Sequence, residues 1–254
     1  MSRLSEAFQK NKKCLIPFVT AGHPDLERSE QILLEMAAAG AHIIEIGIPF
    51  SDPIADGPII QRSSFEALKH GYSLDDYIQM VSRVRQRCDA GLLFMSYLNP
   101  LHKYGLKRLE SEASEAGLDA LLISDLTPEE YRLMAPIESL DTVFLAAPTS
   151  SDRRLKTICE VSRGFVYLVA RTGVTGRHTV VGQEIESTIA RLRPHTSLPI
   201  AVGFGIDSRQ AVERVWKAAD GAVVGSAIVR FIEERRDRPD LPRQVGKFVA
   251  DLIP

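Results

Sequence analysis

The chemistry that this chain suggests begins with a glutamate in an apolar setting. Glu45 is surrounded by isoleucines in the run Ile43–Ile48, which is typical of a strand buried on both faces. A carboxyl group placed there loses hydration, which raises its pKa and suits it to general acid–base catalysis. The alternative is a structural glutamate that pairs with a buried Arg or Lys side chain.

A proline-rich loop follows this run and carries two more carboxylates, Asp52 and Asp56. The prolines restrict its backbone and so lower the entropy cost of holding a side chain in place. Either aspartate could act beside Glu45, and either could instead only form a turn, because Asp before Gly or Pro is common in turns. The spacing alone does not choose between Asp52 and Asp56.

Two glycine motifs late in the chain are typical of phosphate binding. Gly203-Phe204-Gly205 and Gly225-Ser226 each follow an apolar run and precede an amphipathic segment. Glycine lets backbone N–H groups approach an anion, and a helix N-terminus adds further donors. One such motif is often only a turn, but the pair predicts a phosphate site. A third segment, Arg171–Gly176, predicts either a loop that closes over substrate or an ordinary flexible connection.

Apolar runs that alternate with amphipathic stretches define the elements that must position these groups. We expect eight strands and ten helices. The expected strands are Cys14–Thr20, Ile43–Ile48, Leu92–Ser96, Ala120–Ile123, Thr142–Ala146, Phe165–Val169, Ile200–Val202 and Ala222–Val224. The expected helices are Leu26–Ala39, Ile59–His70, Asp75–Arg87, Leu106–Ala116, Glu129–Leu140, Arg153–Val161, Gln183–Arg193, Ser208–Lys217, Ala227–Glu234 and Leu241–Leu252.

This repetition predicts an α/β fold, a single (β/α)8 TIM barrel domain with extra helices over residues 1–254. A doubly wound open sheet is the alternative. Because strand side chains alternate in direction, Glu45 and Gly47 are expected to face the barrel interior, near the catalytic end of their strand. The missing side chain of Gly47 is expected to leave space above the carboxyl group of Glu45.

Composition excludes several classes of function. With 25% charged residues and a net charge of −2, the chain has no basic footprint for nucleic acid, and no apolar run is long enough to cross a membrane. Three separated cysteines and an N-terminus without a signal peptide core predict a cytoplasmic protein. The six histidines lack the spacing of a metal site.

A phosphorylated substrate, an inward carboxyl group and a closing loop together predict proton-transfer chemistry, as in a lyase, an aldolase or an isomerase. The eight expected strands contain no lysine, which disfavours an aldolase that forms a Schiff base.

The same motifs resemble those of a known family, the tryptophan synthase alpha subunits. The resemblance extends from about Ile16 to Val229, and its most specific part is Glu45–Pro58. The other matching segments are Ile16–Gly22, Tyr97-x-Asn99-Pro100, Tyr167, Arg171–Gly176, Gly203–Ile206 and Gly225–Ala227.

The resemblance implies an enzyme of tryptophan biosynthesis that cleaves indole-3-glycerol phosphate to indole and glyceraldehyde 3-phosphate. Glu45 would be the general acid and base, and Asp56, now preferred over Asp52, would hold the indole N–H. The implied indole pocket comprises Phe18, Tyr97, Tyr167 and Phe204. The implied phosphate site comprises Gly176, Gly205, Gly225 and Ser226, with Thr175 closing onto Asp56.

The resemblance also implies a partner, a beta subunit that carries pyridoxal phosphate, in an alpha2-beta2 heterotetramer. The loop Pro49–Asp56 would touch that partner, and this chain would itself need no cofactor or metal. Departures from the family pattern at His23, Ser124–Thr127 and Ala170 leave a second hypothesis, a regulatory subunit with weak catalysis that still activates the beta chain. A sugar-phosphate isomerase is a third.

Overall fold

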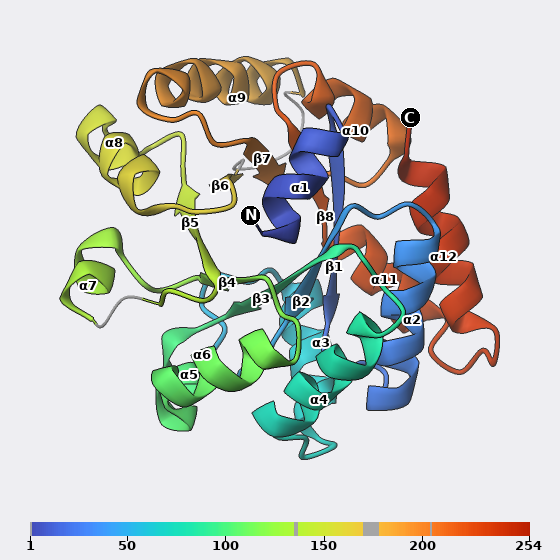
Figure 1. Cartoon of the computed structure of the whole chain (residues 1–254). Helices are drawn as coiled ribbons and strands as arrows, with labels where there is room; N and C mark the ends of the chain where they lie inside the picture. Colours follow the sequence, from blue (N-terminus) through green and yellow to red (C-terminus); the bar gives the residue numbers. More distant parts are fainter. Residues whose placement is uncertain (1, 135–136, 170–177, 204) are drawn as a thin grey trace.

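Eight parallel strands form a closed barrel in which each strand pairs with its sequence neighbours and β8 pairs with β1 (Figure 1). The structure is a computed structural model, and it describes residues 2–134, 137–169, 178–203 and 205–254. Because the sheet closes on itself, the alternative of an open, doubly wound sheet is excluded. The strands are β1 (Cys14–Thr20), β2 (Ile43–Gly47), β3 (Gly91–Ser96), β4 (Ala120–Ile123), β5 (Asp141–Ala146), β6 (Val166–Val169), β7 (Ile200–Gly203) and β8 (Gly221–Val224).

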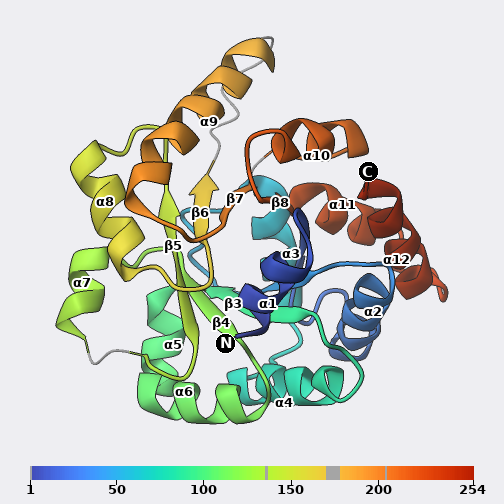
Figure 2. The same cartoon turned by 45° about the horizontal axis from the view of Figure 1, so that its top comes forward.

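Helices surround the barrel in both views (Figures 1 and 2). They cover the outward-facing side chains of the strands, because the buried strands alternate between an inner and an outer apolar layer. The helices are α1 (Arg3–Lys10), α2 (Leu26–Ala38), α3 (Pro58–Leu68), α4 (Leu74–Arg85), α5 (Leu98–Tyr104), α6 (Leu106–Glu115), α7 (Pro128–Leu133), α8 (Asp152–Val161), α9 (His178–Leu192), α10 (Arg209–Trp216), α11 (Ser226–Glu234) and α12 (Leu241–Leu252).

Most expected elements match within three residues, and the main differences concern helices α1, α5, α7 and α9. The expected helix Glu129–Leu140 is wrong in length, since α7 ends at Leu133. Met134 has extended backbone, with φ −87° and ψ 163°, and this ends the helix. Helix α9 begins earlier than expected, at His178. Helices α1 and α5 were not expected from the sequence.

Helix α1 covers the N-terminal end of the barrel (Figure 1). Its Leu4 and Ala7 belong to the same apolar cluster as the inward-facing side chains of the strands. Ser2 caps the helix by accepting from the Ser5 N–H, and it also donates to Asp141 at the start of β5. This end of the barrel is therefore closed, and access to the interior is left to the other end.

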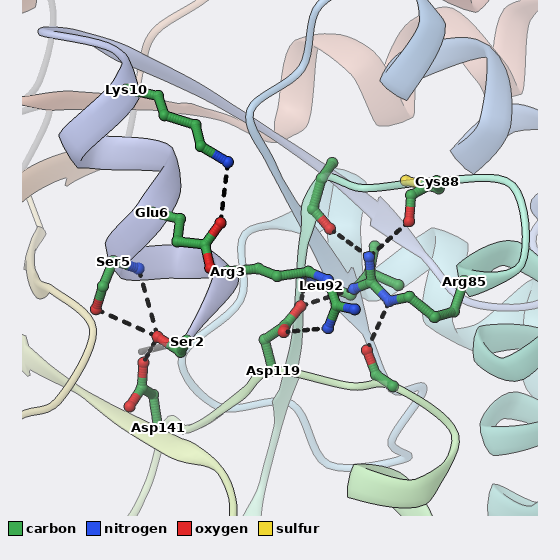
Figure 3. A network of polar contacts seen from close by, with 12 residues as sticks. Ser2, Arg3, Ser5, Glu6, Lys10, Arg85, Cys88, Leu92, Asp119 and Asp141 are labelled. Carbon is green, nitrogen blue, oxygen red and sulfur yellow. Dashed lines mark hydrogen bonds and ion pairs between the residues drawn. The ribbon is translucent and has the colours of Figure 1, made fainter.

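A paired charge network lies beside α1 at the closed end (Figure 3). Asp119, which precedes β4, accepts hydrogen bonds from the Leu92 N–H at 2.8 Å and from Arg85 Nη2 at 2.7 Å. Arg3 Nη1 lies 3.3 Å from its other oxygen. Arg85 also donates to three backbone carbonyl groups. The buried charges here are matched by partners, which indicates a structural role.

Candidate active site

Glu45 faces the barrel interior from the middle of β2. The adjacent Ile44 and Ile46 belong to the outer apolar layer, whereas Ile43 belongs to the inner cluster. The alternation expected from the sequence is thus confirmed. Glu45 is 1% exposed, and its Oε1 atom has no hydrogen-bond partner among the described residues. Burial, with a smaller contribution from the charge of Asp56, raises the pKa of Glu45 to about 8.

Among the described residues, no Arg or Lys forms an ion pair with Glu45, which disfavours a structural salt bridge. With a pKa of about 8, the carboxyl group is mostly protonated at neutral pH. It can therefore donate a proton, and once ionised it is a base strong enough to take one back.

Asp56 approaches the same space from the loop between β2 and α3. Its N–H donates to the Pro53 carbonyl group at 3.0 Å, and the preceding Ala55 N–H donates to the Tyr97 hydroxyl at 3.0 Å. The loop that carries Asp56 is thereby tied to the residue that follows β3. Burial raises the pKa of Asp56 to about 6, although a hydrogen bond from Tyr97 opposes this rise.

Asp52 lies elsewhere. It is exposed and accepts a hydrogen bond from the Ser51 hydroxyl at 2.5 Å. It does not line the cavity that Glu45 and Asp56 share. Geometry therefore favours Asp56 as the second carboxylate, which the spacing in the sequence could not decide.

A cavity of about 470 Å³ opens at the C-terminal end of the barrel. Its lining is mainly apolar, with a few polar groups and glycines. The polar lining residues are Glu45, Asp56, Ser124, Asp207, Ser226 and Arg230. The apolar and glycine lining residues are Phe18, Ala55, Gly57, Ile59, Ile60, Met95, Leu122, Leu145, Tyr167, Val169, Gly205, Ile206, Val223, Gly225 and Ala227. Such a lining suits an aromatic group with a few directed polar contacts.

Two aromatic rings enter the barrel interior where strand glycines leave room for them. A Cβ atom on Gly47 would lie 2.5 Å from Phe18 Cζ, and one on Gly203 would overlap the Tyr167 hydroxyl. The expectation that Gly47 leaves empty space above Glu45 is therefore wrong, because the Phe18 ring fills it. Phe18 also pairs in register with Glu45 across β1 and β2, so the ring and the carboxyl group are neighbours.

The opposite side of the cavity is suited to an anion. Gly205 lines it with a φ of 69°, a left-handed conformation that favours glycine. Helix α11 begins beside it, and the first N–H groups to bond back to Gly225 are those of Ile228 and Val229. The N–H groups of Ser226 and Ala227 come before these two in the first turn of the helix. N–H groups at this position have no acceptor within a helix and commonly bind anions.

Arg230 lies one turn further along α11, on the same face as Ser226, and supplies a positive charge to the lining. It was not singled out from the sequence, although its spacing of four residues from Ser226 was a signal. Met95, Leu122, Ser124 and Leu145 were missed as well. Strand alternation applied to β3, β4 and β5 would have placed these four inward.

The cavity thus brings together seven of the residues singled out from the sequence: Phe18, Glu45, Asp56, Tyr167, Gly205, Gly225 and Ser226. Tyr97 is not part of the lining and contacts the loop behind Asp56 instead. Thr175, Gly176 and Phe204 lie outside the described residues, as does the rest of the segment Arg171–Gly176.

Two other kinds of feature are absent from the part of the chain that the structure describes. There, no group of three or more His, Cys, Asp or Glu side chains is arranged to hold a metal ion. Within the same residues, no helix has both the length and the apolar character needed to cross a membrane.

Comparison with known proteins gives a consistent picture. The family model described as tryptophan synthase alpha chain matches residues 4–248. The tryptophan synthase alpha chain of Geotalea uraniireducens is 43% identical over 259 residues, which covers 99% of this chain and 97% of the relative. That of Geobacter sulfurreducens is 43% identical, with coverages of 99% and 98%.

Solved structures agree with these relatives. The alpha subunit from Legionella pneumophila superposes with a TM-score of 0.91 at 31% identity, covering 99% of this chain and 97% of that one. A structure of the a2b2 complex from Pyrococcus furiosus gives 0.87 at 37% identity, with coverages of 95% and 98%. With its closed barrel, its cavity and these relatives, the chain belongs to the tryptophan synthase alpha chain family.

Proposed function

We propose that the chain cleaves indole-3-glycerol phosphate to indole and glyceraldehyde 3-phosphate, the lyase step of tryptophan biosynthesis. The observation that carries this proposal is Glu45: a buried, mostly protonated carboxyl group whose Oε1 has no partner among the described residues, in an apolar cavity that also holds Asp56. The chemistry needs a proton donor at an aromatic carbon, and a carboxyl group with a pKa of about 8 can supply one near neutral pH.

In the first step, Glu45 donates its proton to C3 of the indole ring. The ring becomes a cation with its positive charge spread toward the N–H group. Ionised Asp56 accepts a hydrogen bond from that N–H and stabilises the charge as it develops. With a pKa of about 6, Asp56 is largely ionised at neutral pH while Glu45 is not, so the two carboxyl groups take different roles.

In the second step, the Glu45 carboxylate takes the proton of the side-chain hydroxyl group next to the ring. The bond between that carbon and C3 breaks, its electron pair returns to the ring, and the hydroxyl carbon becomes the aldehyde. Glu45 has then given one proton and received one, so it is ready for another cycle.

Substrate orientation follows from the two sides of the cavity. The phosphate group would meet the backbone donors near Gly205, Gly225 and Ser226, together with the charge of Arg230. The indole ring would lie among the apolar side chains, beside Phe18. Protonated Glu45 adds no negative charge near the phosphate, which favours binding of an anion.

We further propose a beta subunit as the partner, in an alpha2-beta2 heterotetramer, with pyridoxal phosphate held by that subunit in the cytoplasm. The similar Pyrococcus furiosus structure is that of a tryptophan synthase a2b2 complex and concerns its mutual activation. In this chain Ile54 is 84% exposed, at the tip of the loop that carries Asp56. A single exposed aliphatic side chain is ordinary on a protein surface, so support for the partner comes from the relatives and from the resemblance over Pro49–Asp56.

The decisive experiment measures indole release from indole-3-glycerol phosphate by this chain, alone and with a tryptophan synthase beta subunit. Glu45→Gln and Asp56→Asn serve as the compared variants, and the unmodified complex should be far faster than either. If it is no faster than these variants, the lyase proposal fails. A complex that releases no indole yet accelerates the beta reaction would instead establish a regulatory subunit.

A further inference from the structure

Buried polar atoms without a partner are few, and they gather in two places. Five such side-chain atoms occur among the described residues, and three of them belong to His23 and Glu233, whose Nε2 and Oε2 lie 3.2 Å apart as a pair. The other two are Glu45 Oε1 and Ser124 Oγ. Both of these residues line the cavity of the proposed active site. The proposed reaction accounts for Glu45 but leaves Ser124 unexplained.

The position of Ser124 is fixed by the sheet. It follows β4 directly, and its N–H donates to the Ser96 carbonyl group at 2.8 Å. Leu122, two residues earlier, faces the interior, so Ser124 points the same way. Its neighbours in the cavity lining from the adjacent strands are Met95 and Leu145. The hydroxyl is thus a polar group set among apolar side chains.

Ser124 lies on the side of the cavity away from the proposed phosphate site. Strand β4 is four strands around the closed barrel from β8, after which Gly225 and Ser226 follow. A substrate whose phosphate lies beside α11 therefore extends its aromatic ring toward β4. Ser124 also borders a second cavity of about 290 Å³, which includes Ser150 and Arg154 in its lining. Ser124 therefore lies between the two cavities.

We propose that Ser124 is a specificity-determining residue that lets this chain accept indole rings carrying a hydroxyl group on the six-membered ring. This inference rests on the proposed function and deepens it. A buried hydroxyl without a partner is unfavourable, and unsubstituted indole offers only C–H groups at that end of the ring. A ring hydroxyl can pair with Ser124, and sites built to bond a polar group discriminate strongly against analogues that lack it.

The test runs the reaction in reverse, with glyceraldehyde 3-phosphate and four isomeric hydroxyindoles substituted at ring positions 4 to 7. Each hydroxyindole is compared with the methylindole substituted at the same position, which matches its size but cannot form the hydrogen bond. The readout is the ratio of kcat/KM for hydroxyindole to that for methylindole. For at least one position, Ser124→Ala should lower this ratio tenfold or more.

Two further variants test whether the effect comes from the loss of the Ser124 hydroxyl. Ser124→Gly removes the hydroxyl with a different effect on packing and should lower the same ratio. Ser162→Ala removes a buried hydroxyl that already donates to the Ile158 carbonyl group at 2.8 Å, away from the cavity, and should leave the ratio unchanged. If all four ratios change by less than threefold in both Ser124 variants, the inference is overturned, and a loss of threefold or more at one position supports it.

Failure of the proposed function can be recognised separately. If the unmodified chain condenses neither indole nor any substituted indole, the lyase proposal fails. The role of Ser124 is then tested by equilibrium binding, as the ratio of Kd for hydroxyindole to Kd for methylindole in the unmodified chain and in Ser124→Ala. An equal ratio in the two proteins would overturn the inference, and a ratio at least threefold higher in the variant would support it.

Discussion

Glu45 and Asp119 are two buried carboxyl groups of one barrel, one facing the open cavity from the middle of β2 and one at the end that α1 closes, and they differ in their partners. Asp119, at the end that α1 closes, is bonded to Arg85, Arg3 and a backbone N–H (Figure 3). Burial raises the pKa of both groups, but at Asp119 these partners act against the rise. At Glu45, where the barrel is open, the charge of Asp56 adds to the effect of burial.

The difference shows that burial alone does not decide what a carboxyl group does. A desolvated carboxylate with cationic partners fixes the backbone around it, and its ionisation is not available for chemistry. A desolvated carboxyl group without them keeps its proton near neutral pH and can exchange it with a substrate. Variants at the two residues should therefore give opposite results.

The largest expected effect is on catalysis at Glu45. Glu45→Gln keeps the shape of the side chain but cannot transfer a proton, so kcat/KM for indole release should fall at least a thousandfold, about 4 kcal/mol. Its free energy of unfolding at neutral pH should be equal to or higher than that of the unmodified chain. Steady-state kinetics and urea denaturation on the same preparations measure both. A stable variant with normal kcat/KM would remove Glu45 from the mechanism.

At the closed end the effect should be on stability. Asp119→Ala leaves Arg85 buried without its carboxylate and should lower the free energy of unfolding by about 3 kcal/mol, with kcat/KM of the folded protein nearly unchanged. Urea denaturation measures the loss. Glu160→Ala is the control, because it breaks an exposed pair with Arg132 and should cost less than about 1 kcal/mol. Equal losses in the two variants would contradict a structural role for the network.

The pH dependence of the free energy of unfolding should reveal the raised pKa of Glu45. The pKa of Glu45 rises from its ordinary value of 4.5 to about 8 on folding, so its contribution to stability is complete below pH 4.5 and is lost as pH rises through 8. Between pH 5 and pH 8.5 the unmodified chain should lose on the order of 3 kcal/mol relative to Glu45→Gln. Denaturation curves at several pH values give this difference, and parallel behaviour of the two proteins would refute the raised pKa.

A substitution at Gly205, in the proposed phosphate site, should have a smaller effect on substrate binding. Gly205→Leu should raise the KM for indole-3-glycerol phosphate at least tenfold, about 1.4 kcal/mol, by crowding the phosphate. Gly71→Leu is a matched control, because Gly71 has a similar φ of 71° but no atoms near its Cβ position. Both variants strain the backbone alike, and only the first should affect binding. The same KM in both would argue against a phosphate site beside Gly205.

The smallest effect concerns the coupling of the two active-site carboxyl groups. The profile of kcat/KM against pH should be bell-shaped, rising near pH 6 with ionisation of Asp56 and falling near pH 8 with ionisation of Glu45. In the slow variant Asp56→Asn the rising limb should disappear, and the falling limb should move to lower pH because the negative charge that raises the pKa of Glu45 is gone. An unmoved falling limb would mean that the two groups do not interact.

The strands and the orientation of Glu45 could be predicted from the sequence because both depend on local patterns. Short apolar runs marked all eight strands, and alternation along β2 gave the direction of each side chain. Helix α1 was not predicted because only Leu4 and Ala7 among its residues are buried, and the residues around them are polar. Its packing depends on the end of the barrel that it covers.

Features that depend on contacts between distant segments could not be predicted. The Phe18 ring occupies the space beside Gly47 because β1 and β2 are neighbours in a register that the sequence does not state. Whether the Ser124 hydroxyl finds a partner depends on side chains from other strands. The spacing of Asp52 and Asp56 left the choice between them open. The resemblance preferred Asp56, and the structure shows why it reaches the cavity: its loop folds back toward Tyr97. Each is a property of packing in three dimensions.

The bond between the Ala55 N–H and the Tyr97 hydroxyl has a consequence for communication. Ile54, exposed on one side of that bond, and Asp56, directed into the cavity on the other, are two residues apart in a backbone held at its midpoint. We therefore expect a displacement of Ile54 by a neighbouring protein to displace the Asp56 side chain as well, because only the bonded residue Ala55 lies between them. The rate of the proposed cleavage would then depend on whether that neighbour is bound.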